Sequence, residues 1–123
     1  MRNLKIRQAR PDENNFFADS WIKNMRANEP FKNMDFAILS KEYFPVIQTM
    51  LKEFDTFVAT HEEEDNEILS FINFRLSDKF HMVNFIYTKK PYRKLGVARE
   101  LIQKTILDNK HGQPIFFTHF SQK

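Results

Sequence analysis

The sequence contains no cysteine and only two glycines among its 123 residues. The absence of cysteine excludes disulfide bonds, thiolate zinc sites and cysteine nucleophiles. It is typical of a reducing compartment, so we expect the protein in the cytoplasm. No run approaches the roughly 18 consecutive apolar residues that a membrane span needs. Residues 1–7 also lack the apolar run of a signal peptide.

Strong charge of either sign is missing as well, since 19 basic and 16 acidic side chains give a net charge of +3. This excess is too small to indicate a nucleic-acid-binding protein by itself. The four histidines are too widely spaced for a ligand motif, so we expect no metal site. The charges are unevenly placed, however, because residues 89–104 are mainly basic and residues 53–67 contain no Lys or Arg.

What is present is a regular succession of strand and helix patterns. Apolar, β-rich stretches predict strands over 4–9, 56–60, 68–76, 82–88 and 115–120. Apolar residues at helical spacing predict helices over 12–26, 40–54 and 96–109. Ser40 would cap the second helix and place Pro45 in its first turn. No repeat or linker interrupts the chain, and its fourteen phenylalanines predict a Phe-rich core, so we expect one domain over 1–123.

The element order β-α-α-β-β-β-α-β predicts an α+β fold with a mixed sheet. The three adjacent strands joined by tight turns should form an antiparallel meander. The strand–helix–strand that follows should be a right-handed crossover, which makes the last strand parallel to the strand before the helix. Two strands joined in this way can splay at the connecting turn, so a linear ligand would fit in the gap between them.

The most informative stretch is 86–102, where an apolar strand passes through a short basic turn with Gly96 into a helical pattern. The first N–H groups of a helix have no partners within it, and the helix dipole adds partial positive charge there. Such a junction is an anion-binding device, so we expect a phosphate-bearing ligand.

The residues at this junction resemble the signature of the GNAT superfamily of N-acetyltransferases, which is Arg or Gln, two residues, Gly, one residue, and Gly or Ala. Here it reads Arg93-Lys94-Leu95-Gly96-Val97-Ala98. Tyr92 before it, the apolar strand 83–88 and the following Leu101-Ile102 also match the family. The resemblance covers nearly the whole chain in its element order, and only about residues 82–106 in detail.

The resemblance implies acetyl-CoA as co-substrate. Backbone N–H groups from Lys94 to Ala98 would hold the pyrophosphate, and Gly96 would let the backbone approach it closely. Arg93 and Lys94 would add charge-assisted hydrogen bonds. The strand would pair with the pantetheine arm. The residues implied in binding are Ile86, Tyr87, Thr88, Arg93, Lys94, Leu95, Gly96, Val97 and Ala98.

The group that removes a proton from the amine is left open by the sequence. Candidates near the central strands are His81, His119 and Glu67, although each histidine also fits a structural role at the rim of the sheet. Asn84 is a polar residue on an apolar strand and would orient a water molecule. Tyr87 would place its hydroxyl near the thioester. We therefore take His81, Asn84 and His119 as catalytic candidates.

The resemblance also implies a departure, because the family continues past its fifth strand into a helix, which often carries an acidic tyrosine, and two more strands. A natural short form, completion by a partner subunit such as a homodimer mate, or lost activity would each explain the difference. The expected function is acetyl transfer to an amine-bearing small molecule or protein, which the acidic segment 62–67 would attract. The alternatives are a non-catalytic CoA-binding or protein-interaction module and, third, nucleic-acid binding through residues 89–99.

Overall fold

The computed structural model describes residues 3–27, 31–109 and 113–117. They form a mixed five-stranded sheet in the order β1-β2-β3-β4-β5. Neighbouring strands are antiparallel from β1 to β4, whereas β4 and β5 are parallel. The predicted α+β class, meander and parallel crossover are therefore confirmed. The strands are β1 (Leu4–Gln8), β2 (Asp55–His61), β3 (Ile68–Arg75), β4 (His81–Thr88) and β5 (Ile115–Phe117).

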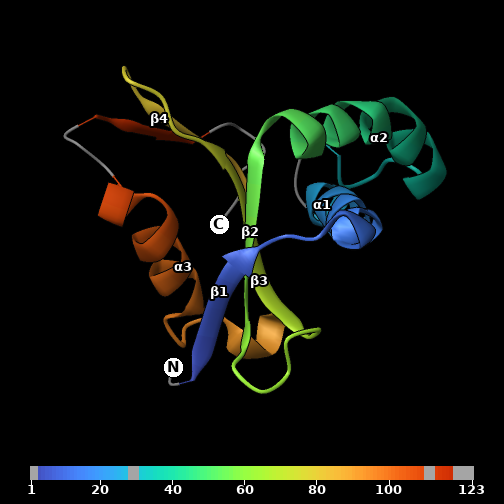
Figure 1. Cartoon of the computed structure of the whole chain (residues 1–123). Helices are drawn as coiled ribbons and strands as arrows, with labels where there is room; N and C mark the ends of the chain where they lie inside the picture. Colours follow the sequence, from blue (N-terminus) through green and yellow to red (C-terminus); the bar gives the residue numbers. More distant parts are fainter. Residues whose placement is uncertain (1–2, 28–30, 110–112, 118–123) are drawn as a thin grey trace.

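Helices cover both faces of this sheet, as Figure 1 shows with the sheet seen nearly edge-on. The 3-10 turn η1 (Pro11–Glu13), α1 (Asn14–Arg26) and α2 (Phe36–Glu53) lie on one side. On the other side lies α3 (Val97–Thr105), between the 3-10 turns η2 (Lys90–Tyr92) and η3 (Leu107–Asn109). Within the described residues, no helix combines the length and apolar character that crossing a membrane requires.

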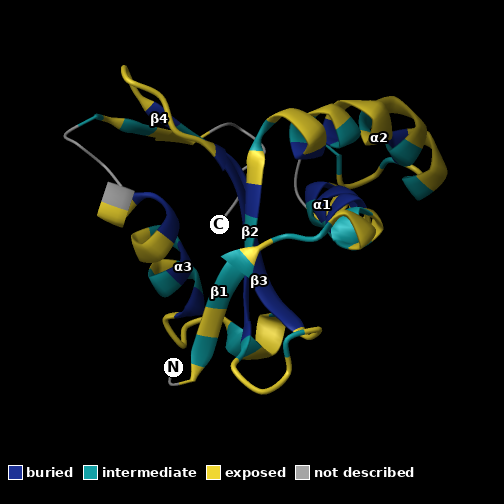
Figure 2. Cartoon of the chain, viewed as in Figure 1, coloured by how far each residue is buried: buried dark blue, intermediate teal, exposed yellow. Residues whose placement is uncertain are grey.

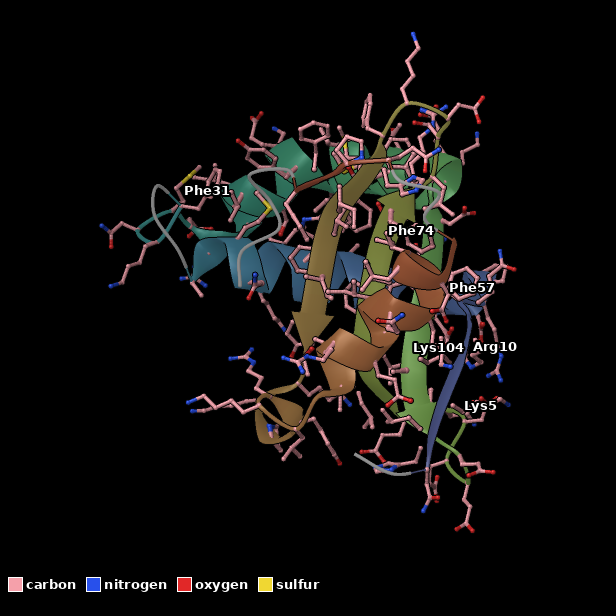
Figure 3. All side chains as sticks on the ribbon, turned by 90° about the vertical axis from the view of Figure 1, so that its left-hand side faces the viewer. Lys5, Arg10, Phe31, Phe57, Phe74 and Lys104 are labelled. Carbon is pink, nitrogen blue, oxygen red and sulfur yellow. The ribbon has the colours of Figure 1, made fainter. Side chains whose placement is uncertain are left out.

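The two faces of the sheet carry separate apolar cores. Their buried residues are among those coloured dark blue on the ribbon in Figure 2. Against α1 and α2, the ring of Trp21 stacks on Phe85 with centroids 4.6 Å apart, and Phe17 packs on Phe71 at 4.7 Å. Against α3, the core is more aliphatic; it includes Phe74, and the partly buried Phe57 packs against it (Figure 3). The prediction of a Phe-rich core is confirmed for the first face.

The predicted start of the second helix is wrong. The helix begins at Phe36, because Asp35 is its N-cap and accepts a hydrogen bond from the N–H of Ala37 at 2.8 Å. Both Asp35 and Ser40 are good capping residues, but the longer helix also buries Leu39 completely. Pro45 consequently lies inside α2 and not in its first turn.

Other boundaries differ by smaller amounts. The third helix ends at Thr105 and passes into η3, so the predicted helix over 96–109 is too long. The structure describes β5 only over Ile115–Phe117. Residues 118–120 of the predicted last strand lie outside the described residues.

Candidate functional site

The turn between β4 and α3 has an unusual backbone. Gly96 has φ +83° and is the N-cap of α3, where no side chain caps the helix. Lys94, two residues earlier, also has a positive φ of 68°, a conformation that is uncommon for residues other than glycine. A Cβ on Gly96 would meet no atom within 4 Å. The turn therefore presents the N-terminus of α3 to open space.

The outer edge of β4 lies beside this turn. The N–H of Lys89 donates to the carbonyl of Leu69 on β3 at 2.8 Å, and the carbonyl of Tyr87 accepts from Ser70 on β3 at 2.7 Å. Because backbone groups alternate in direction along a strand, those of Ile86 and Thr88 point away from β3. The carbonyl of Thr88 accepts a hydrogen bond from Nε of Arg93 at 2.8 Å on this outer side.

β5 accompanies only the first part of β4. Its three residues pair with His81, Met82 and Val83, and no described residue pairs with the outer edge of β4 after them. At the same place β4 contains a bulge, since Asn73 on β3 is opposite Phe85 while Phe74 is opposite Val83, which leaves Asn84 as the extra residue. A bulge bends a strand and increases its twist. The two parallel strands therefore part at the bulge.

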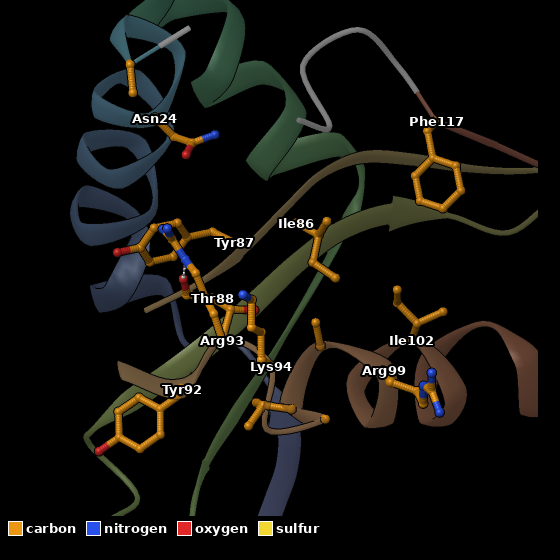
Figure 4. Close-up of a pocket in the computed structure, with 14 residues that line it drawn as sticks. Asn24, Ile86, Tyr87, Thr88, Tyr92, Arg93, Lys94, Arg99, Ile102 and Phe117 are labelled. Carbon is orange, nitrogen blue, oxygen red and sulfur yellow. Dashed lines mark hydrogen bonds between the residues drawn. The ribbon is translucent and has the colours of Figure 1, made fainter. Parts of the chain in front are cut away.

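A cavity of about 1020 Å³ occupies the gap (Figure 4). Its walls come from the end of α1, the second half of β4, the turn after η2, the first turns of α3 and the end of β5. All residues expected to bind the co-substrate line it except Leu95. The lining residues are Asn24, Ala27, Ile86, Tyr87, Thr88, Tyr92, Arg93, Lys94, Gly96, Val97, Ala98, Arg99, Ile102 and Phe117.

The described lining is electropositive. Arg93, Lys94 and Arg99 contribute cationic side chains, and no described lining residue is Asp or Glu. The guanidinium of Arg93 lies 6.0 Å from the centre of the Tyr87 ring, in addition to its bond to Thr88. Together with the N-terminus of α3, these cations favour a ligand that carries several negative charges.

The catalytic candidates are placed differently. Asn84 is buried at the bulge, where its Nδ2 donates to Oδ1 of Asn73 at 2.9 Å, and it does not line the cavity. His81 is buried at the opposite end of β4, about 16 Å along the strand from Ile86. Its Nδ1 accepts from the N–H of Ser77 at 3.3 Å. His119 lies outside the described residues. The catalytic roles of all three stay predictions.

Within the acidic segment 62–67, Glu62, Glu63, Glu64 and Glu67 are exposed, whereas Asp65 is engaged in ion pairs. The Asp65 carboxylate accepts from Nε of Arg7 at 2.9 Å and pairs with Lys5 at 3.2 Å and with Arg10. Glu67 does not line the cavity. Among the described residues, no three His, Cys, Asp or Glu side chains are grouped so that they could hold a metal ion.

Some lining residues are absent from the sequence-based prediction. Arg99 follows Gly96 by three residues, so helical spacing alone places it on the same first turn. Asn24, Ala27 and Phe117 come from α1 and β5, and only the tertiary structure brings them to β4. Sequence reasoning had no signal for these three.

Comparison with known proteins adds an independent observation. The model of the family described as "Acetyltransferase (GNAT) family" matches residues 17–111. No curated protein sequence matches this chain.

Solved structures with a similar fold include a GCN5-related N-acetyltransferase from Ralstonia eutropha JMP134, with a TM-score of 0.67, 13% identity, and coverage of 94% of this chain and 83% of that one. An acetyltransferase of the GNAT family from Staphylococcus aureus MU50 has a TM-score of 0.57 and 16% identity over 85% and 65% of the two chains. An aminoglycoside acetyltransferase from an uncultured soil metagenomic sample, in complex with sisomicin, has a TM-score of 0.59 and 17% identity over 94% and 77%. At these identities the likeness shows the shared fold.

Proposed function

This chain belongs to the acetyltransferase (GNAT) family, and from this premise we propose that it transfers an acetyl group from acetyl-CoA to a primary amine. The observation that carries the proposal is the left-handed Gly96 at the uncapped N-terminus of α3, open to a cavity that borders the unpaired edge of β4. A pyrophosphate needs backbone donors and room for close approach, and this turn offers both.

The residues of the cavity fit the parts of acetyl-CoA in order. Backbone N–H groups of the turn from Lys94 to Ala98 would hold the pyrophosphate, with positive charge from Arg93, Lys94 and Arg99. The outward carbonyl of Ile86 would accept a hydrogen bond from the pantetheine arm, as in an added strand. Thr88 is less available, because its carbonyl already accepts from Arg93.

The reaction would be a direct transfer. The amine nitrogen attacks the thioester carbonyl carbon, the C–N bond forms, the C–S bond breaks, and one proton leaves the nitrogen while the thiolate gains one. The outward N–H of Ile86 would stabilise the charge that develops on the carbonyl oxygen. Positioning of the two reactants in the gap would supply much of the rate.

Proton removal from the amine completes this mechanism. No described residue of the cavity lining is a histidine or carboxylate, so water is the acceptor that we propose. His81 and Asn84 could act only through other groups, because neither lines the cavity. This observation favours the second candidate function, a module that binds CoA or another protein without catalysis.

We propose an amine-bearing small molecule or a protein amine as the acceptor. The outer edge of β5 is the surface that we propose for a homodimer, since an unpaired strand edge is able to pair with a copy of itself. A cytoplasmic location also remains part of the proposal.

Two measurements on the purified protein test the proposed function. Acetyl-CoA at about 100 times its Kd should raise the melting temperature by about 10 °C, because binding to the folded state alone stabilises it. Release of free thiol with a panel of amines, including an aminoglycoside, a polyamine and a basic peptide, should then report turnover. Binding without turnover on any amine of the panel would favour the non-catalytic alternative. Absence of acetyl-CoA binding would remove both acetyl transfer and CoA binding, and only the protein-interaction module would be left.

A further inference from the structure

Two buried asparagines lie on neighbouring strands, Asn73 on β3 and Asn84 on β4. Asn73 is 0% exposed and Asn84 is 1% exposed. Buried amides are retained in an apolar sheet only where their hydrogen-bonding groups find partners. Asn73 was not singled out by the sequence, because one polar residue in a strand pattern is usually assigned to the solvent face.

Their hydrogen bonds form a chain from β4 to the end of α2. Nδ2 of Asn84 donates to Oδ1 of Asn73 at 2.9 Å, and Nδ2 of Asn73 donates to Oγ1 of Thr56 at 3.0 Å and to the carbonyl of Met50 at 3.2 Å. A carbonyl can only accept, so the contact with Met50 determines which end of the Asn73 amide carries the nitrogen. Its oxygen must then face Asn84.

This chain of hydrogen bonds ends at Asn84, in the bulge of β4 beside the cavity. Asn84 is the extra residue of the β4 bulge, and β5 stops pairing at Val83, immediately before it. Two residues later, Ile86 turns its backbone to the cavity. The side chain of Asn73 is therefore hydrogen-bonded to the residue at which β4 and β5 separate.

We propose that Asn73 is a positioning residue: its hydrogen bond to Asn84 anchors the bulge and so sets where the outer edge of β4 stands relative to the N-terminus of α3. Its relevance to catalysis rests on the proposed acetyl transfer. Asn73 touches neither the cavity nor a reactant. It acts through Asn84, by preventing the extra residue from being absorbed into a regular ladder or shifted along the strand.

The test compares Asn73→Leu with the matched control Thr56→Val. Each substitution introduces a side chain of about the original size and removes buried hydrogen bonds of the same network. Thr56→Val, however, leaves the hydrogen bond between Asn73 and Asn84 intact. With the amine that the wild-type protein uses, Asn73→Leu should lower kcat by about tenfold or more, since displacements of about 1 Å can cost as much as 100-fold. The Kd of CoA itself should change less than threefold, because its phosphates bind at α3. Thr56→Val should leave kcat within twofold.

A second readout does not depend on acetyl transfer. Amide hydrogen exchange in the free protein, measured by NMR, should accelerate at residues 84–88 in Asn73→Leu and remain unchanged there in Thr56→Val. Unchanged exchange at these residues, or equal loss of kcat in both variants, would overturn the inference and leave Asn73 a structural residue. If the wild-type protein neither binds acetyl-CoA nor transfers an acetyl group, the proposed function fails and the exchange result alone decides whether Asn73 holds the bulge.

Discussion

At the scale of single residues, the turn before α3 concentrates backbone conformations that side chains disfavour. Lys94 and Gly96 have φ values of 68° and 83° within three residues of each other. The space beside Gly96 is open, so steric crowding within the protein does not explain why a glycine occupies this position. Such conformations gather at binding sites, where a ligand needs the backbone that they create.

Two substitutions of Gly96 should distinguish two effects: loss of the space that the ligand occupies, and strain in the left-handed backbone. Asn tolerates a left-handed conformation better than Ala does, but its side chain takes more of the open space. We expect Gly96→Asn to weaken CoA binding at least tenfold with a small fall in melting temperature. Gly96→Ala should lose more thermal stability and less affinity. Isothermal titration and thermal melts check this order, and the reverse order for affinity would mean that strain, not room, decides binding.

At the scale of elements, a cluster of ion pairs ties β1 to η1 and to the β2–β3 turn. The Glu13 carboxylate accepts from Arg7 at 3.0 and 2.7 Å and from the N–H of Arg10 at 2.8 Å. Arg7 also donates to Asp65, and Lys5 and Arg10 lie along the same edge of the sheet (Figure 3). The Arg7 and Glu13 side chains are only 11% exposed, so this pair is more than a surface contact. It links β1 to the residue that precedes α1.

The stability of this cluster should depend on pH. Burial by itself raises the pKa of Glu13. The hydrogen bonds from Arg7 and Arg10 and their charges lower it by a larger amount, so the pKa lies below its ordinary value of 4.5. A carboxyl whose pKa is lowered by folding stabilises the protein above its unfolded pKa and stops doing so as the pH falls through its folded pKa.

We therefore expect Glu13→Gln to lower the free energy of unfolding by about 1–3 kcal/mol at pH 7, because Arg7 loses its buried partner. As the pH falls below 4.5 and through the lowered pKa of Glu13, the difference from wild type should diminish. Urea titrations between pH 7 and 3 measure both effects. Asp19→Asn is the control, because the exposed pair of Asp19 with Lys23 is worth at most about 0.5 kcal/mol. A constant difference at all pH values would contradict the assignment.

At the scale of the whole molecule, the charge is distributed in a way that the net value of +3 conceals. The carboxylates of Glu13 and Asp65 form ion pairs with Arg7 at the β1 edge of the sheet. Arg93, Lys94 and Arg99 meet at the cavity, and no ion pair engages them among the described residues. Three cations without an ion pair in the described part of the chain are therefore gathered where β4 and β5 part.

Binding of acetyl-CoA should consequently weaken with salt. Raising NaCl from about 50 to about 500 mM shortens the screening length severalfold, so we expect the Kd of acetyl-CoA to rise about tenfold. S-acetylpantetheine, which lacks the phosphates, is the matched control and should bind weakly with little dependence on salt. Isothermal titration at several ionic strengths makes the comparison, and equal salt slopes for the two ligands would show that the cations do not contact phosphate.

Much of the architecture could be predicted because its signals are local. The junction 86–102 is contiguous in the chain, so the strand, the basic turn with Gly96 and the helix can be recognised from spacing alone. The start of α2 could not, because Asp35 and Ser40 both suit a cap and the burial of Leu39 decided between them. Local preferences select elements, while packing sets their ends.

The sequence by itself determined the order of the elements, the mixed sheet and the phosphate-type turn, since these follow from periodicity and residue chemistry over short windows. Only the tertiary structure decided the bulge at Asn84, the buried contact of Asn73 and the arrival of Asn24 and Phe117 at the cavity. These depend on strand register and on the packing of α1 and β5. A shift of one residue in register reverses which face a side chain occupies, and because β3 is buried on both faces, alternation of apolar and polar residues does not select its register.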